Sequence, residues 1–221
     1  MKKITLILVS FLMIASVSTF TSCKKNPTTL PTINLMGSST IYLSLNAGFI
    51  EPGVTATNSD GAYLNVKITS IPTFNKDLVG TYVFTYSAFD IYGNTNSVTR
   101  TVIVQNDAIR FEGTYSATDD GIIGSWHNTW TETIVASTTI NNRVNFSSFG
   151  NYEHCQPFAD FNTDHSKVNL FEQTFNCGTP TADHTFSGIG TVSSDKTITV
   201  PYTKVTGITT NTGIAVFTKQ I

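Results

Sequence analysis

The two tryptophans of the chain have a spacing that could form a ligand-binding face. Trp126 and Trp130 are four positions apart in a run that reads as a β-strand, so both indoles point to one side, about 13 Å apart. Asn128 and Glu132 share that side, and Tyr115 lies on the preceding predicted strand. Indoles stack on the apolar faces of sugars, and amide, phenol and carboxylate groups bond sugar hydroxyls. These five residues therefore predict a glycan-binding face; the competing interpretation, more usual for tryptophan, is that both indoles fill a core.

Carboxylates in the C-terminal half could serve acid–base chemistry, but their spacing pairs none of them. Hydrolysis of a glycosidic bond needs two carboxylates that face one sugar. The chain also has no Gly-x-Ser-x-Gly elbow and no glycine-rich phosphate loop. We therefore expect solvated charges at turns and rims, in a protein that is not an enzyme and needs no cofactor. The acidic residues concerned are Asp119, Asp120, Glu132, Glu153, Asp160, Asp164 and Glu172.

The N-terminus has the pattern of an export signal. Two lysines precede an apolar segment over residues 4–17, which is shorter than the ~20 residues of a comfortable membrane span. The sequence Phe-Thr-Ser-Cys at residues 20–23 then resembles a bacterial lipoprotein signal, although Phe20 and Ser22 replace the more usual Leu and Gly or Ala. The resemblance implies that residues 1–22 are removed, that Cys23 carries a lipid and that residues 23–30 form a tether. The alternative is an ordinary signal peptide that leaves Cys23 as a free thiol.

The charge around the predicted anchor bears on where the protein resides. Loss of Lys2 and Lys3 would change the formal net charge from −2 to −4. Lys24 and Lys25 follow the cysteine, where acidic residues would favour surface export in Bacteroidota-type proteins. We expect an outer-membrane lipoprotein of the cell envelope, and the sequence leaves its periplasmic or surface side open. No basic cluster indicates a nucleic-acid partner.

The two other cysteines, Cys155 and Cys177, fall outside the interiors of the predicted strands. In an exported chain they are expected to pair, and a disulfide that closes about 22 residues contributes roughly 3 kcal/mol on the chain-entropy estimate. The alternative is a metal site, because histidines and aspartates lie in the same region. None of these has a zinc-type spacing, so we predict the disulfide and no metal. The residues in question are His154, Asp160, Asp164, His165 and His184.

A period of two dominates residues 80–104. Aromatic residues and Ala88 alternate with threonine and serine over residues 81–88, which is typical of a strand with one buried face. Residues 92–94, Tyr-Gly-Asn, break the pattern, and residues 99–104 supply a second, β-branched run. The pair predicts a hairpin in which Tyr82, Tyr86, Val102 and Val104 are buried.

Several short motifs run through residues 49–104: Phe49-x-Glu51-Pro52-Gly53-Val54-x-Ala56, Gly80-Thr81-Tyr82, Tyr86-x-Ala88-x-Asp90, Gly93-Asn94 and Arg100-Thr101-Val102-x-Val104. Their spacing resembles bacterial immunoglobulin-like modules, similar to hyalin-type repeats and to the Ig-like modules of some crystal toxins. The resemblance covers residues 31–106 and implies a β-sandwich that acts as a spacer or adhesive stalk. It places Tyr82 at a tyrosine corner, where the hydroxyl bonds upstream backbone. Residues 31–106 contain neither cysteine nor tryptophan.

Two polar features of these residues have more than one interpretation. Related modules often have an acidic run that could bind calcium, which needs several oxygen ligands. Here residues 58–61 are Asn-Ser-Asp-Gly, which we interpret as an Asx turn. Arg100 has the parity of Val102 and Val104, so it lies at a sheet rim or follows a bulge.

Residues 107–221 contain short β-branched and aromatic runs separated by turns, including Asp-Asp-Gly at 119–121 and residues 193–196. They predict an up-and-down meander, closed or nearly closed into a barrel, since closure removes exposed edges. Gly113-Thr114-Tyr115 and the overall length resemble a calycin or lipocalin-like domain, although Tyr115 replaces the tryptophan of true lipocalins. A two-sheet sandwich is the alternative. The predicted strands cover residues 110–118, 125–135, 143–149, 168–175, 184–192, 197–205 and 213–218.

Together these features predict an all-β chain, an Ig-like β-sandwich followed by an antiparallel barrel-like domain. The leading function is non-catalytic binding or scaffolding of an extracellular ligand. A glycan or an envelope protein is the expected partner, and the lipid engages the membrane. A purely structural or adhesive stalk is the second interpretation, and an envelope hydrolase is the third.

Overall fold

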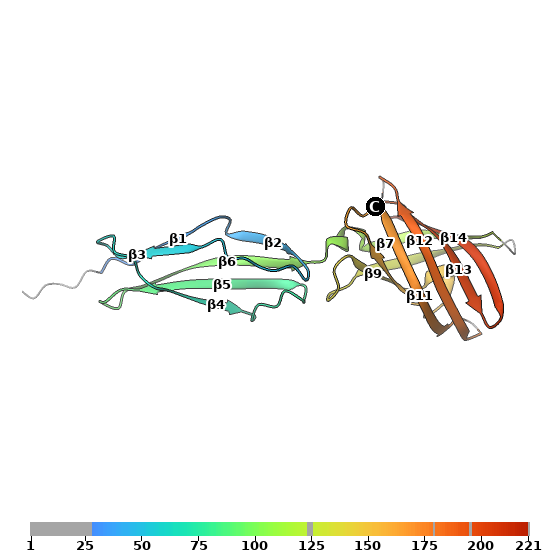
Figure 1. Ribbon diagram of the computed structural model, residues 1–221, viewed down its shortest axis with the longest axis horizontal. Coiled ribbons are helices and arrows are strands. Elements are labelled where there is room, and N and C mark those ends of the chain that lie inside the picture. Colours follow the sequence, from blue (N-terminus) through green and yellow to red (C-terminus); the bar gives the residue numbers. More distant parts are fainter. Residues whose placement is uncertain (1–27, 123–125, 179, 195, 221) are drawn as a thin grey trace, which may run out of the picture.

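The computed structural model describes residues 28–122, 126–178, 180–194 and 196–220, which form two β-rich parts arranged end to end (Figure 1). The predicted fold class is confirmed, because Ig-like sheets come first and a closed eight-stranded antiparallel barrel follows. Cys23 and the predicted signal peptide lie outside the described residues. Within those ranges, no helix has both the length and the apolar character needed to cross a membrane.

Six strands build the Ig-like part: β1 Thr32–Leu35, β2 Thr40–Ser44, β3 Val54–Thr57, β4 Val66–Ile71, β5 Gly80–Phe89 and β6 Thr95–Gln105. The larger sheet has the order β2-β6-β5-β4, and β1 pairs with β3 in a second, two-stranded sheet. Strand β2 runs parallel to β6, while the other pairs are antiparallel. The predicted hairpin is therefore the central pair β5–β6, with β2 and β4 at the edges.

The predicted alternation of β5 and β6 is confirmed. Tyr82, Tyr86, Val102 and Val104 are each at most 2 % exposed, while the intervening threonine and serine side chains of β5 are exposed or half-buried. The Tyr82 hydroxyl donates to the backbone carbonyl of Leu78 at 2.8 Å. This contact confirms the tyrosine corner.

Arg100 is neither at a rim nor after a bulge, because it points into the core and its side chain has no exposed surface. Its Nη2 donates to the Met36 carbonyl at 2.7 Å and lies 3.3 Å from Oε1 of Glu51. The Tyr86 hydroxyl donates to the other oxygen of Glu51, and burial, followed by Glu51, raises the pKa of Tyr86. The Glu-Pro-Gly motif therefore places a carboxylate against a buried guanidinium.

Residues 58–61 form the Asx turn that we predicted. The side-chain oxygen of Asn58 accepts hydrogen bonds from the amides of Asp60 at 3.0 Å and Ala62 at 2.8 Å. This oxygen is thus occupied by the turn itself.

The C-terminal part is a barrel whose eight strands follow one another around the wall, and the last strand, β14, closes it by pairing with the first, β7. Closure rules out the sandwich alternative. A bidentate ion pair from Arg143 to Asp160, at 2.6 and 2.9 Å, reinforces the short pair β9–β10. The strands are β7 Gly113–Gly121, β8 His127–Ala136, β9 Arg143–Phe146, β10 Phe158–Phe161, β11 Lys167–Cys177, β12 Ala182–Val192, β13 Ile198–Thr206 and β14 Thr209–Lys219.

Three expectations for this barrel need correction. Asp119, Asp120 and Gly121 are the last residues of β7 and not a turn, because the inward alternation of Tyr115 and Ala117 continues to Asp119. The predicted strand start at residue 110 lies in a short 3-10 helix, η1 Asp107–Phe111. Strand β10 was missed, since four residues with a central aspartate give too short an apolar pattern.

Aromatic side chains fill the middle of the barrel. A second 3-10 helix, η2 Phe149–Asn151, brings Phe149 against Phe146, Phe186, Tyr202 and Phe217, whose ring centroids lie 5.2 to 5.8 Å from that of Phe149. All five rings are at most 4 % exposed. The centre is therefore a packed core, and space for a ligand must be sought at the ends.

The loop between β8 and β9 joins the two parts. Asn106, between β6 and η1, is 1 % exposed and donates to the carbonyls of Ser137, Ile140 and Arg143 at 2.9 to 3.0 Å. The same loop bonds to the Ig-like part through Asn46 and Val79. These contacts fix this end of the barrel against the Ig-like part (Figure 1).

Candidate ligand-binding site

The opposite end of the barrel, which we call the free end, carries several buried polar side chains. Strands β7, β11 and β13 finish there and β8, β12 and β14 begin there, because neighbouring strands of a meander run in opposite directions (Figure 1). We define the free-end cluster as Asp119, Trp126, Tyr152, Tyr202 and Lys204. Asp119, Tyr202 and Lys204 are 1 %, 4 % and 8 % exposed, respectively, and Trp126 and Tyr152 are half-buried.

Asp119 is a buried carboxylate with only one of its oxygens engaged. Oδ2 accepts hydrogen bonds from the Trp126 indole at 2.9 Å and from the Tyr202 hydroxyl at 2.8 Å. Oδ1 has no hydrogen-bond partner among the described residues. Burial raises the pKa of Asp119 above its ordinary value, against the opposing effect of its two donors and of Lys204. A hydrogen-bond donor from a ligand would satisfy Oδ1 and stabilise the charged form.

Two glycines make room for this arrangement. A Cβ on Gly121 would lie 2.5 Å from the indole of Trp126, so the indole can rest on the backbone of β7 only because position 121 lacks a side chain. A Cβ on Gly213 would lie 2.8 Å from Oδ1 of Asp119 and 2.9 Å from the Tyr202 ring. Glycines at positions 121 and 213 therefore leave the space in which the indole and the carboxylate lie side by side.

Tyr152 is held over the barrel end by two further glycines. Gly150 and Gly178 both have positive φ angles, 69° and 84°, and a Cβ on either would lie 3.2 or 3.1 Å from opposite edges of the Tyr152 ring. The ammonium of Lys204 donates to the Tyr152 hydroxyl and lies 4.3 Å from the ring centroid of Tyr152 and 5.7 Å from that of Trp126. Lys204 is thus enclosed between two aromatic rings.

The predicted disulfide is confirmed and anchors the loop that carries Tyr152. Cys155 and Cys177 are bonded, with their Cα atoms 5.3 Å apart. The amide of Gly178 donates to the Glu153 carbonyl at 2.9 Å, which adds a second link between the loop and the end of β11. The disulfide therefore restrains Tyr152 and, through it, the surroundings of Lys204.

A polar hollow of about 570 Å³ opens beside this tyrosine. It is lined by Asn128, Gly150, Asn151, Tyr152 and Glu153. Sites for small ligands usually measure about 300–1,000 Å³, so this volume suits a sugar unit. Because Tyr152 lines the hollow and also contacts Lys204, the hollow and the free-end cluster form one candidate site.

The structure places the five residues of the predicted face in different surroundings. Trp126 and Asn128 are half-buried at the free end. Tyr115 and Glu132 have no exposed surface, and their polar groups are bonded within the barrel, so they support the site and offer no free group to a ligand. The Tyr115 hydroxyl donates to the Phe111 carbonyl at 2.7 Å, and burial raises its pKa to about 12. Trp130 packs edge-on against Phe217, with ring centroids 6.0 Å apart.

Glu132 has a structural role that its position in the sequence did not predict. Its carboxylate accepts hydrogen bonds from the Trp130 indole at 3.1 Å, from the amide and hydroxyl of Ser147 at 2.6 Å each, and from the amide of Ser148 at 3.1 Å. These bonds hold the segment that leads through η2 to Tyr152. Glu132 and Asp119 therefore correct the expectation that the acidic residues are solvated at turns and rims.

The residues considered for a metal are spread over the barrel. Asp160 pairs with Arg143, and His165 contacts Arg110 and Asn142 beside η1. His184 faces the free end, where its Nδ1 lies 2.7 Å from the Thr206 hydroxyl, and burial, followed by Lys204, lowers its pKa. In the part of the chain that the structure describes, no three His, Cys, Asp or Glu side chains are grouped to hold a metal ion.

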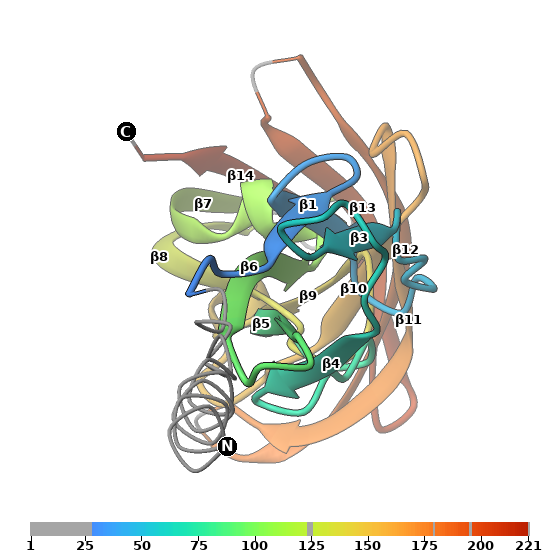
Figure 2. The ribbon, with the colours of Figure 1, turned by 90° about the vertical axis from the view of Figure 1, so that its left-hand side faces the viewer.

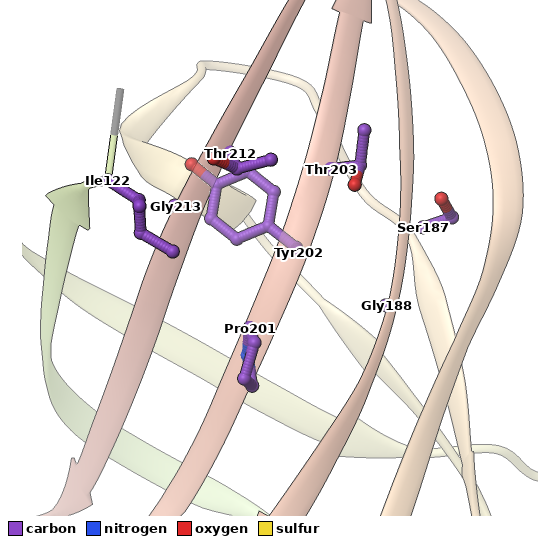
Figure 3. Close-up of a pocket in the computed structure, with 8 residues that line it drawn as sticks. All are labelled: Ile122, Ser187, Gly188, Pro201, Tyr202, Thr203, Thr212 and Gly213. Atoms are coloured by element: carbon purple, nitrogen blue, oxygen red, sulfur yellow. The ribbon is translucent and has the colours of Figure 1, made fainter. Parts of the chain in front are cut away.

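A second concavity, of about 210 Å³, lies on the barrel wall over β12, β13 and β14. Figure 3 shows Ile122 and the Tyr202 ring converging near Thr212 and Gly213, while Gly188 leaves the neighbouring strand bare. Apart from Tyr202, the groove is lined by serine and threonine hydroxyls, by the aliphatic side chains of Ile122 and Pro201, and by two glycines. This groove offers little to orient a ligand, but it shares Tyr202 with the free-end cluster.

Sequence spacing contained a signal for residues that we missed. Tyr202 and Lys204 continue the inward parity of Ile198 and Val200 on β13, and Asp119 continues that of Tyr115 on β7. A lysine or an aspartate with the same parity as buried residues indicates a buried polar site, because these side chains are almost never fully buried unless they are paired. Tyr152 had no such signal, because η2 and the disulfide position it and no strand pattern does.

Comparison with known families identifies the first part of the chain. Residues 33–104 match the family described as bacterial surface protein, Ig-like domain. The match confirms the predicted Ig-like module and covers only that portion. A search of curated proteins gave no match.

Two solved structures have distant similarity to the chain. One is the lipoprotein BT2262 from Bacteroides thetaiotaomicron, with 16 % identity, a TM-score of 0.35, and coverage of 86 % of this chain and 100 % of that one. The other contains CBM51-2 in complex with GlcNAc and INT domains from Clostridium perfringens ZmpB, with 14 % identity, a TM-score of 0.27, and coverage of 86 % of this chain and 44 % of that one. Both TM-scores are below 0.5, so neither similarity bears on the function of this chain.

Proposed function

We propose that this chain is a lipid-anchored protein of the bacterial cell envelope that binds a glycan at the free end of its barrel without catalysis. The family matched by residues 33–104 supports a location at the bacterial surface. The lipid at Cys23 rests on the signal pattern of residues 20–23. The Ig-like part would serve as the spacer between the anchor and the barrel.

The observation that carries the proposal is the unsatisfied polarity of the free end. Oδ1 of Asp119 is buried without a partner, next to the half-buried indole of Trp126 and close to the hollow lined by Asn128 and Tyr152. A sugar offers hydroxyl donors for the carboxylate and an apolar ring face for an aromatic side chain. A buried acceptor without a partner costs about 1–3 kcal/mol, and a bound hydroxyl would recover part of it.

Intrinsic fluorescence of the full-length protein in detergent, titrated with a panel of neutral and acidic polysaccharides, tests this proposal. Both tryptophans lie in the barrel, so binding at the free end should shift the emission. Trp126→Ala should weaken binding measured by calorimetry about tenfold, or ~1.4 kcal/mol. Tyr63→Ala is the matched control, because Tyr63 is an aromatic side chain of the Ig-like part that is 82 % exposed.

The alternatives predict other results. A purely structural or adhesive stalk predicts that no glycan shifts the fluorescence or gives heat. An envelope hydrolase predicts shortened products after incubation with a bound glycan, and such products would overturn the non-catalytic assignment.

A further inference from the structure

We propose that the glycan bound at the free end contains an acidic sugar whose carboxylate pairs with Lys204. This inference rests on the proposed function and specifies the chemistry of the same site. It follows from the surroundings of the Lys204 ammonium, from the engagement of Asp119, and from the hollow beside Tyr152.

Lys204 is a buried cation without a carboxylate partner. It is 8 % exposed and forms no ion pair with any described carboxylate. Its one hydrogen bond among the described residues goes to the hydroxyl of Tyr152, whereas an ammonium group can donate three. A buried charge is costly unless it is paired and hydrogen-bonded, so an anionic group from outside would stabilise this lysine.

The nearby acidic groups do not fill that role. Asp119 already accepts two hydrogen bonds at Oδ2 and forms no ion pair with Lys204. Asp183 is exposed and accepts a hydrogen bond from Asn176. Glu153 is exposed on the rim of the hollow, where water and salt screen its charge. Burial, followed by Lys204, lowers the pKa of His184, another basic side chain at this end.

The two unmet requirements of the site match one kind of ligand. Oδ1 of Asp119 needs a hydrogen-bond donor, and Lys204 needs an anionic acceptor. A neutral sugar supplies hydroxyls for the first but no charge for the second. A sugar that carries a carboxylate supplies both, and the hollow of about 570 Å³ beside Tyr152 accommodates the unit.

Calorimetry on the full-length protein tests this inference with paired ligands. The probes are oligosaccharides from polygalacturonate, alginate and hyaluronan, each compared with its own carboxyl-reduced, neutral form. At least one acidic form should bind at least tenfold more tightly than its reduced counterpart. Lys204→Met should abolish this preference, Lys204→Arg should retain it, and Lys167→Met should leave it unchanged, because Lys167 is exposed on the outer wall.

Each contrary result has a separate meaning. Equal binding of acidic and reduced forms would overturn the acidic-sugar inference and leave glycan binding standing. A preference that survives in folded Lys204→Met would place the carboxylate elsewhere and also overturn it. No binding of any acidic or neutral oligosaccharide would overturn both proposals. If Lys204→Met fails to fold, the wild-type preference and its retention in Lys204→Arg decide the question.

Discussion

At the scale of single residues, two polar side chains occupy positions that the β-sheet pattern reserves for apolar ones. Arg100 has the parity of Val102 in the Ig-like part, and Asp119 has that of Ala117 in the barrel. Arg100 meets a carboxylate, a phenol ring and backbone carbonyls, while its Nε and Nη1 are buried without a hydrogen-bond partner among the described residues. Asp119 also leaves one oxygen unsatisfied, and it differs from Arg100 in lying beside the half-buried Trp126 at the free end, where we propose a ligand-binding site.

The two sides of the Arg100 contact should respond differently to mutation. Glu51→Ala leaves a buried guanidinium without its counter-charge and should destabilise the Ig-like part by about 3–5 kcal/mol. Arg100→Met removes the charge and should cost less. Urea unfolding followed by circular dichroism reports this, because the Ig-like part contains no tryptophan. If Glu51→Ala lowers the free energy of unfolding by no more than Arg100→Met does, the ion pair does not stabilise the core.

The raised pKa of Asp119 predicts a pH-dependent cost to stability. Below the ordinary pKa of an aspartate, the carboxyl is protonated in both states and no penalty arises. As the pH rises above it, the unfolded chain ionises more readily, so a penalty accumulates up to the folded pKa and then stays constant. Asp119→Asn should therefore stabilise the barrel more at pH 7 than at pH 3, measured by tryptophan fluorescence in urea.

Asp120→Asn is the control for this measurement, since Asp120 is the exposed neighbour of Asp119. It should give no pH-dependent gain. A gain from Asp119→Asn that is the same at both pH values would contradict the assigned pKa direction.

At the scale of elements, the alternation of apolar and polar residues predicted most of the strands. It failed where polar side chains point into the barrel. The hairpin β5–β6 and most barrel strands follow from periods of two. The end of β7 resembled a turn because two aspartates precede Gly121, yet one of them points inward. The site itself could be predicted only in part. Trp126 and Asn128 followed from spacing, whereas Tyr152 depends on η2, two glycines and a disulfide.

Removing the disulfide should affect both stability and binding. Replacing Cys155 and Cys177 by serine should destabilise the barrel by roughly 3 kcal/mol, because the unfolded chain regains loop entropy. It should also weaken glycan binding, since Tyr152 loses its anchor. Urea unfolding and calorimetry below the transition separate the two effects. Unchanged affinity in the folded double mutant would show that Tyr152 does not contribute to the site.

At the scale of the whole molecule, the two parts place the candidate site far from the N-terminal end. Figure 2 views the molecule from the Ig-like part, with the barrel strands behind it. Asn106 and the loop between β8 and β9 fix one end of the barrel to the Ig-like part, which leaves the other end free. An anchor at the N-terminus would therefore present the site away from the membrane.

The proposed anchor makes a simple prediction for localisation. Cys23→Ala should move the protein from the membrane fraction to the soluble fraction and abolish incorporation of labelled fatty acid. Ser22→Ala, which keeps a small residue before the cysteine, should retain both. Membrane association of Cys23→Ala, together with no labelling of the wild type, would contradict lipidation.

The most direct test of the central claim is hydrogen–deuterium exchange of the full-length protein with and without a saturating glycan from the panel. Binding at the free end predicts slower exchange in residues 117–122, 148–156 and 202–206, and unchanged exchange in residues 33–104. Protection confined to the Ig-like part or to the outer barrel wall, or no protection with any glycan, would contradict the assignment of this site.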